Sequence, residues 1–149
     1  MKPIECPDCN YFYCDKTICK CGKILTKNNH IKQVIIIRKD LKMRRGKEIA
    51  QGSHASMQFM IDRRIKNLPF TTDEIIWMEN DMTKIVLTVN SEDELLDIYH
   101  TALDLDLNSY IVRDLGKTEF RGRETFTAVA IGPNKSEDID PITKGLKLY

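Results

Sequence analysis

Lys47 is the residue whose surroundings most clearly indicate chemistry in this chain. It follows Arg44 and Arg45 at the start of a long predicted helix that covers residues 46–66. A helix N-terminus already carries positive partial charge, so each cation there costs a few tenths to about 1 kcal/mol unless an anion joins it. Free N–H groups and cations together favour an anion, most often a phosphate. A solvated basic loop is the alternative interpretation.

Two more polar side chains share the side of the helix on which Lys47 lies. Gln51 follows one turn later and His54 two turns later, and the helical repeat points all three in roughly the same direction. A lone helical histidine is more often a structural or surface residue than a catalytic one. Its neighbours, a lysine and an amide, favour a functional site.

The cysteines form a second group with chemical potential. All five lie between Cys6 and Cys21, in a Cys-x-x-Cys pair and a tighter Cys-x-Cys pair. Paired cysteines this close are typical of tetrahedral Zn²⁺. Four thiolates leave no open coordination position, so a structural role is expected. The alternative is a tail of reduced thiols without metal. The predicted ligands are Cys6, Cys9, Cys19 and Cys21, with Cys14 as a substitute for one of them and His30 as a remote candidate.

Charge is distributed unevenly, although the 149-residue chain has a net charge of only +1. Residues 38–47 contain six basic side chains and one acidic one, whereas residues 92–106 contain six acidic side chains and no lysine or arginine. One face is therefore expected to be cationic. No run of 18 apolar residues and no apolar leader occur, so a cytoplasmic location is the default expectation.

The elements that must position these residues alternate between strands and helices. Predicted strands cover residues 34–37, 85–89, 110–112 and 127–131, with Gly132-Pro133 ending the last one. Capping boxes at Thr71/Glu74 and Ser91/Glu94 predict two further helices, and a short helical turn follows Ser136. The inward faces are predicted to be Ala50, Met57, Ile61 and Ile65 in the first helix, and Leu95, Ile98, Tyr99 and Ala102 in the helix after Ser91.

This order predicts an α/β fold with helices on both sides of the sheet. The short link between the last two strands permits a hairpin, which favours a mixed sheet over a purely parallel one. A domain boundary near residue 29 separates the cysteine-rich segment, residues 1–29, from the patterned body, residues 30–149.

The body resembles the peptidyl-tRNA hydrolases of the archaeal/eukaryotic type. The resemblance covers about residues 31–149 and rests on two blocks in the family's order. The first block comprises residues 32–43 with Gly46, Lys47, Ala50, Gln51, His54 and Ala55, and the second comprises residues 113–119, 125–127 and 131–133. It implies a three-layer α/β/α sandwich around a mixed four-stranded sheet, a homodimer, and hydrolysis of the ester that joins a peptide to the 3′ end of tRNA.

The resemblance also implies roles for individual residues. The leading catalytic group would be Lys47, Asp114 and Thr118, with Gln51, His54 and Thr127 lining or supporting the same pocket. The tRNA backbone would be contacted by Arg38, Lys42, Arg44 and Arg45. No cofactor is expected for catalysis, and no membrane partner.

The residue types suit ester hydrolysis. A carboxylate such as Asp114 orients or activates water if its pKa is suitable, and Lys47 stabilises developing negative charge. Neither a Gly-x-Ser-x-Gly elbow nor a cysteine occurs in the body, so a covalent acyl-enzyme is disfavoured.

Two positions depart from the family pattern. Leu115 stands where the family usually has alanine, and Arg44 stands where many members have a smaller residue. Two alternative functions stay open. One is a tRNA-, RNA- or protein-binding module without catalysis, and the other is an aminoacyl-tRNA deacylase.

Overall fold

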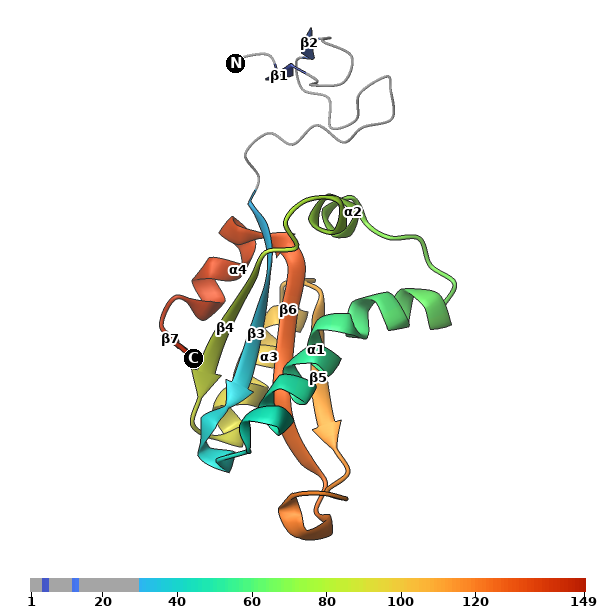
Figure 1. The fold of residues 1–149 in the computed structure, drawn as a ribbon. Helices are drawn as coiled ribbons and strands as arrows, with labels where there is room; N and C mark the ends of the chain where they lie inside the picture. Colours follow the sequence, from blue (N-terminus) through green and yellow to red (C-terminus); the bar gives the residue numbers. More distant parts are fainter. Residues whose placement is uncertain (1–3, 6–11, 14–29) are drawn as a thin grey trace. The chain divides into compact units, whose positions relative to one another are not determined.

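A computed structural model of the chain describes residues 4–5, 12–13 and 30–149 (Figure 1). The chain divides into two units, Met1–His30 and Ile31–Tyr149. In the first unit, β1 (Ile4–Glu5) pairs antiparallel with β2 (Phe12–Tyr13). The five cysteines, and with them the predicted zinc ligands, lie outside the described residues. Among the described residues, no helix is both long and apolar enough to span a membrane.

The second unit is built on one mixed sheet in the order β5-β6-β3-β4-β7. Only β3 and β4 are parallel, and every other neighbouring pair in this sheet is antiparallel. The predicted mixed sheet and the β5–β6 hairpin are therefore confirmed. The strands are β3 (Ile31–Arg38), β4 (Lys84–Val89), β5 (Ser109–Asp114), β6 (Thr125–Lys135) and β7 (Lys147–Leu148).

The prediction of four strands in this sheet is wrong, because a fifth one closes its edge. β7 contains two residues and pairs with β4 through Leu148 opposite Leu87. So short a strand has no detectable alternation of its own, and it forms because the chain end returns to an open edge. The prediction that Gly132-Pro133 ends the last strand is also wrong. β6 continues to Lys135, and a register shift between Lys32 and Val34 of β3 accommodates the irregular backbone.

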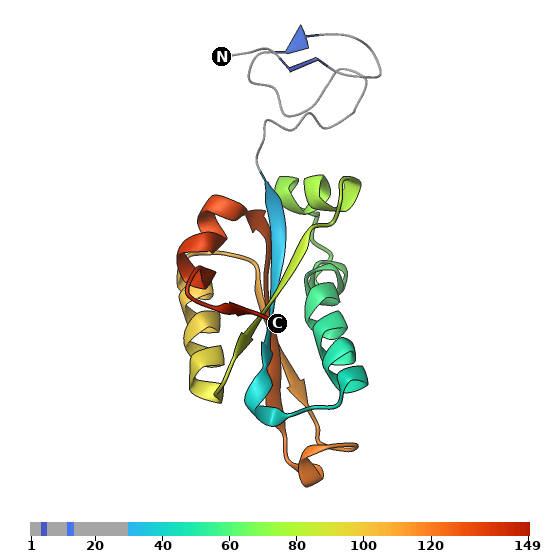
Figure 2. The same ribbon diagram turned by 60° about the vertical axis from the view of Figure 1, so that its left-hand side comes forward.

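Helices lie on both faces of the sheet (Figure 2). One face carries α1 (Arg45–Ile65) and α2 (Thr72–Glu79), and the other carries α3 (Glu92–Asp104) and α4 (Ser136–Thr143). Successive residues of β3 alternate between the two cores: Ile35 and Ile37 face α1, while Val34 and Ile36 pack with α3 and α4. Two short 3₁₀ turns, η1 (Lys39–Leu41) and η2 (Phe120–Gly122), complete this unit.

The predicted helix starts differ in how many of their capping hydrogen bonds are formed. The Thr71/Glu74 capping box is confirmed in both directions. At α3 the Ser91 hydroxyl accepts from the Glu94 N–H, but the Glu94 carboxylate accepts from the Asn90 N–H instead of closing the box on Ser91. The α1 N-cap, Arg44, forms no side-chain cap hydrogen bond, so the N–H groups of this helix start are not capped by a side chain.

The predicted inward stripe of α1 is wrong, whereas that of α3 is confirmed. Ala50 is exposed, and Met57, Ile61 and Ile65 are 51%, 40% and 76% exposed. The buried side chains of α1 are Gln51, Ala55, Ser56 and Phe59. The buried face thus combines small and polar side chains with one aromatic side chain, where a stripe of large aliphatic ones was expected, and Ala55 packs with Ile35, Ile37 and the alanines of β6.

Candidate functional site

The candidate site forms where the first turns of α1 meet the end of β5 and the loop that follows it. Lys47 and Gln51 come from α1, Asp114 is the last residue of β5, and Thr127 lies near the start of β6. Thr118 belongs to the β5–β6 loop, residues 115–124. Residues up to 80 positions apart in the chain therefore converge because α1 crosses the β5–β6 hairpin.

Lys47 and Asp114 form the centre of this group. The Lys47 Nζ atom lies 2.5 Å from Asp114 Oδ2, and both side chains are largely buried, at 14% and 13% exposure. The same ammonium donates to Thr118 Oγ1 at 3.1 Å. An ammonium has three N–H donors. Among the described residues Lys47 has these two hydrogen-bond partners, which leaves one N–H able to meet an oxygen of a ligand.

Gln51 and Thr127 support this centre from the sheet side. The buried Thr127 hydroxyl donates to Gln51 Oε1 at 2.5 Å, and the Gln51 amide then donates to Asp114 Oδ2 at 3.5 Å. This second distance is at the long limit for a hydrogen bond. The anchored carbonyl oxygen of Gln51 therefore directs its NH₂ group toward the carboxylate.

The environment of Asp114 lowers its pKa. Burial acts in the opposite direction and raises it, but the hydrogen bond from Lys47, the one from the Gly116 N–H and the charges of Lys47 and His54 prevail. The carboxylate is therefore ionised at neutral pH. A base is most effective when its pKa is near the working pH, so this environment favours Asp114 for orienting water over removing its proton.

The remaining predicted catalytic residue, His54, lies at the edge of this group. Its side chain is exposed, and it acts on Asp114 through charge. In the structure, hydrogen bonds therefore link five of the six predicted catalytic residues in series, and the sixth, His54, lies beside them. Their catalytic roles stay predictions, since proximity does not test a role.

The four predicted tRNA contacts fall into two classes. Lys42, Arg44 and Arg45 are exposed, as a phosphate contact requires. Arg38 is only 7% exposed. Its guanidinium donates to the Asp40 and Glu92 carboxylates and to the Phe126 carbonyl, which fixes β3 to the start of α3. The exposed three are consequently better placed for tRNA than Arg38.

Sequence reasoning missed three residues that shape this site. Gly116 has φ of 76°, and a Cβ there would lie 2.5 Å from the Arg123 carbonyl oxygen. The ring centroid of Phe120 lies 5.8 Å from Lys47 Nζ, within the range of a cation–π contact. Glu119 pairs with Arg44. Both Gly116 and Glu119 lie in the second motif block, so the signal was present, but nothing in the sequence assigned them a partner.

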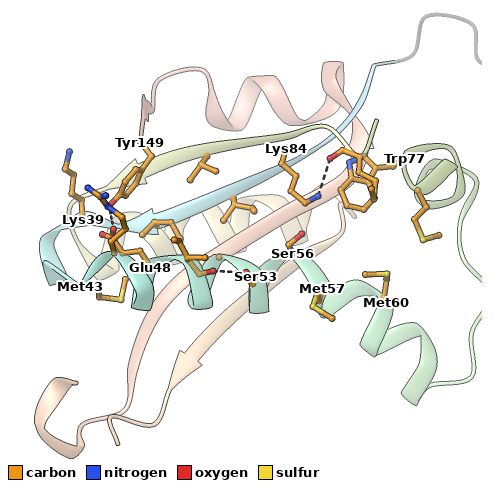
Figure 3. A pocket seen from close by; sticks show the side chains of 18 of the residues that line it. Lys39, Met43, Glu48, Ser53, Ser56, Met57, Met60, Trp77, Lys84 and Tyr149 are labelled. Carbon is orange, nitrogen blue, oxygen red and sulfur yellow. Dashed lines mark hydrogen bonds between the residues drawn. The ribbon is translucent and has the colours of Figure 1, made fainter. Parts of the chain in front are cut away.

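A large apolar groove runs along α1 (Figure 3). The helical repeat places Lys47 on the opposite side of this helix. The groove has a volume of about 1350 Å³ and a floor formed by Ile35, Ile37 and Val86 of the sheet. The α1 side chains that line it, such as Ile49 and Ser53, project away from the side that carries Lys47 and Gln51. Large apolar pockets are the default expectation for ligand sites, but the convergent polar groups lie elsewhere. The groove does explain the exposure of Met57, which lines it.

The described residues contain no cluster of three or more His, Cys, Asp or Glu side chains arranged to hold a metal ion. This finding does not cover the five cysteines, which lie outside the described residues.

Comparison with known proteins gives a consistent result. The family model described as "Peptidyl-tRNA hydrolase PTH2" matches residues 31–149. A peptidyl-tRNA hydrolase of Methanocaldococcus jannaschii is 48% identical over 118 residues, which cover 79% of this chain and 99% of that protein. One from Methanothermobacter thermautotrophicus is 42% identical over 120 residues, or 79% and 99% of the two chains. A probable peptidyl-tRNA hydrolase 2 of Dictyostelium discoideum is 41% identical over 119 residues, which cover 79% of this chain but only 54% of that protein.

Proposed function

Since this chain belongs to the peptidyl-tRNA hydrolase PTH2 family, we propose that it hydrolyses peptidyl-tRNA at the contact between Lys47 and Asp114. The observation that carries the proposal is the buried pair itself, with Nζ and Oδ2 2.5 Å apart and both side chains braced by neighbours. The reaction breaks the ester between a peptide, or an N-blocked amino acid, and the 3′-terminal ribose of tRNA.

The geometry suggests a division of work among the residues. Asp114 accepts a hydrogen bond from the attacking water and orients it toward the ester carbonyl. Lys47 directs its third N–H at the oxyanion that develops on that carbonyl. Such a donor is typically worth about 10²–10³ in kcat. Thr118 meets the water or the ribose, and Gln51 with Thr127 keeps the Asp114 carboxylate in place.

The proton balance of this step is simple. Water adds its oxygen to the ester carbonyl and releases a proton, and the ribose oxygen takes up a proton as the C–O bond breaks. Because the pKa of Asp114 is lowered, this carboxylate is a weak proton acceptor. We therefore assign it the orientation of water and assign no residue as the required general base.

The experiment compares two substrates and two proteins. Purified wild-type protein and Asp114→Asn are given N-acetyl-aminoacyl-tRNA and the same tRNA with an unblocked aminoacyl group. Rapid cleavage of the blocked substrate alone, with at least tenfold loss in the variant, supports the proposal. Preference for the unblocked ester would indicate a deacylase, and tRNA binding without either cleavage would indicate a binding module.

We also propose that Lys42, Arg44 and Arg45 contact the tRNA backbone. The support is their exposure beside the uncapped start of α1, where N–H groups and cations favour phosphate. Arg38, already bonded to Asp40 and Glu92, would support this surface from beneath. The cytoplasm, where translation takes place, is the proposed location, and a homodimer stays a prediction that a solution mass measurement can check.

For the N-terminal unit we propose a structural zinc site. The support is sequence spacing alone: Cys6 and Cys9 form one pair, Cys19 and Cys21 the other, and Cys14 can replace a member of the second. We expect about one Zn²⁺ per chain by elemental analysis. The double variant Cys6→Ser/Cys9→Ser should contain none, and full retention of zinc by this variant would exclude the assignment.

A further inference from the structure

The β5–β6 loop, residues 115–124, is a built structure that the proposed chemistry uses only in part. Its turns are closed by hydrogen bonds from the Gly122 N–H to the Gly116 carbonyl and from the Arg123 N–H to the Phe120 carbonyl, each 3.0 Å long. At its base the Gly116 N–H donates to Asp114 Oδ1 at 2.9 Å. The loop therefore has a defined shape that is coupled to the catalytic carboxylate.

The inner side of this loop is attached to α1. Thr118 accepts a hydrogen bond from Lys47, Glu119 pairs with Arg44 at 2.9 Å, and the Phe120 ring lies beside the Lys47 ammonium. Three consecutive loop residues thus hold the site closed on one side. What the loop presents outward lies next to the reacting groups.

The outer side of the loop is cationic. Lys117, Arg121 and Arg123 are exposed, and none of them has an ion-pair partner within the described part of the chain. The two acidic residues of the loop pair with other arginines, Glu119 with Arg44 and Glu124 with Arg113.

Backbone strain supports a functional reading of this surface. Phe120 and Arg121 have φ of 64° and 50°, and Gly122 follows with 75°. A non-glycine residue in this left-handed region is strained, and such strain concentrates at ligand-binding sites. Glycine or asparagine would relieve this strain at position 121, but neither carries a positive charge.

We propose that the β5–β6 loop binds the unpaired 3′-terminal strand of tRNA, with Lys117, Arg121 and Arg123 contacting its phosphates. Leu115, which is 52% exposed beside Asp114, supplies an apolar surface for a terminal base. The inference rests on the proposed function, because the scissile ester is at the end of this strand and must reach Lys47. Cationic side chains that follow the backbone are typical of single-stranded nucleic-acid sites.

The test compares two variants that each lose three positive charges. One is Lys117→Gln/Arg121→Gln/Arg123→Gln, which neutralises the loop. The matched control is Arg64→Gln/Lys144→Gln/Lys147→Gln, which neutralises three exposed cations that lie outside the loop and have no ion pair in the described residues. Thermal unfolding confirms that both variants are folded. For each variant and the wild type, the affinity is measured for uncharged tRNA with an intact 3′ end and for the same tRNA lacking its last three nucleotides. Both affinities are measured over a series of salt concentrations.

We expect the loop variant to bind intact tRNA at least tenfold more weakly than wild type, while its affinity for the truncated tRNA stays within twofold. The slope of log K against log salt concentration should decrease in magnitude by about 2, since each of the three lost single-strand phosphate contacts contributes roughly 0.7. The control substitutions should weaken the binding of both tRNAs by the same small factor. Equal weakening of both tRNAs by the loop variant would overturn the proposal. So would displacement of truncated and intact tRNA alike by an acidic peptide that binds the loop.

Failure of the two proposals is distinguishable in this design. If the wild type binds the 3′ end through the loop but cleaves no ester, the hydrolase assignment fails and the loop inference stands. If the wild type cleaves the ester and the loop substitutions weaken the binding of intact and truncated tRNA equally, the loop inference alone fails.

Discussion

Replacing Lys47 with methionine removes a charge from the centre of the site while keeping most of the volume of the side chain. In the folded protein this ammonium is 14% exposed and bonds to both Asp114 and Thr118. If its third N–H stabilises the oxyanion, its loss should lower kcat by about 10²–10³, or about 2.7–4 kcal/mol. KM should change far less, because Lys42, Arg44 and Arg45, which bind the tRNA backbone in this proposal, are unaltered.

The same substitution should alter the pH dependence, with a sign that follows from Asp114. Its pKa is lowered in the wild type, so the ionised form stabilises the fold above the unfolded-state pKa of about 3.9, and this contribution is lost as pH falls through the folded-state pKa. Without Lys47, burial raises the pKa of Asp114 with less to oppose it. The acid limb of kcat should therefore move upward in the variant and be absent from the wild type above about pH 5.

Single-turnover cleavage of N-acetyl-aminoacyl-tRNA from pH 4.5 to 8, corrected for spontaneous hydrolysis, measures both effects. Lys66→Met is the matched control, because Lys66 ends the same helix in an exposed pair with Asp62 and should leave kcat within twofold. Turnover of Lys47→Met within threefold of wild type would refute the oxyanion role. An unchanged acid limb together with a large loss of kcat would refute the pKa argument while sparing that role.

Three further predictions concern the frame around the pair. Gly116→Ala should lower kcat at least tenfold and the free energy of unfolding by about 1–2 kcal/mol, since its Cβ would meet the Arg123 carbonyl at 2.5 Å; urea unfolding and the cleavage assay check both values. Thr127→Val should cost about 1–3 kcal/mol of stability and reduce kcat, because it leaves Gln51 Oε1 without its donor, whereas Thr127→Ser should retain activity. Glu74→Gln should lower the free energy of unfolding by about 2–3 kcal/mol without altering kcat, since the fully buried carboxylate accepts hydrogen bonds from Arg63; an altered kcat would show that α2 is coupled to the site.

The strands and the capped helices could be predicted because their signals are local. The β-branched run at residues 34–37 indicates a strand wherever the chain folds, and Thr71 caps α2 through Glu74, three residues away. The short β7 could not be predicted in this way. Leu148 becomes a strand residue only because Leu87 offers it an open sheet edge, and that edge is a property of the assembled fold.

The face of α1 was mispredicted for a related reason. Periodicity identifies large apolar residues and assumes that they are buried, which led to Met57 and Ile65. The actual buried face contains Phe59 together with the small or polar Gln51, Ala55 and Ser56, and Ala55 packs with Ile35, Ile37 and the alanines of β6. Sequence alone does not state which surface a helix will meet.

The site shows the same division between local and assembled information. Family motifs identified Lys47, Asp114 and Thr118. They did not indicate that the Lys47 ammonium would hydrogen-bond both of the other side chains, or that the Gly116 N–H would donate to the Asp114 carboxylate. The pKa of Asp114 in particular depends on the balance between burial and those bonds. Whether it acts as a base or as a guide for water could therefore be argued only once the contacts were known.

The unfavourable cations at the start of α1 find their anions in two different ways. Lys47 is paired with a carboxylate in a largely buried contact, whereas Arg44, 80% exposed, meets Glu119 at the surface. An exposed ion pair is worth only about 0–1 kcal/mol, so a tRNA phosphate can replace Glu119 at Arg44 at little cost. The proposed mechanism requires the Lys47–Asp114 pair to persist as substrate binds. Recognition can then adjust at the rim of the site, while the geometry that stabilises the oxyanion stays fixed beneath it.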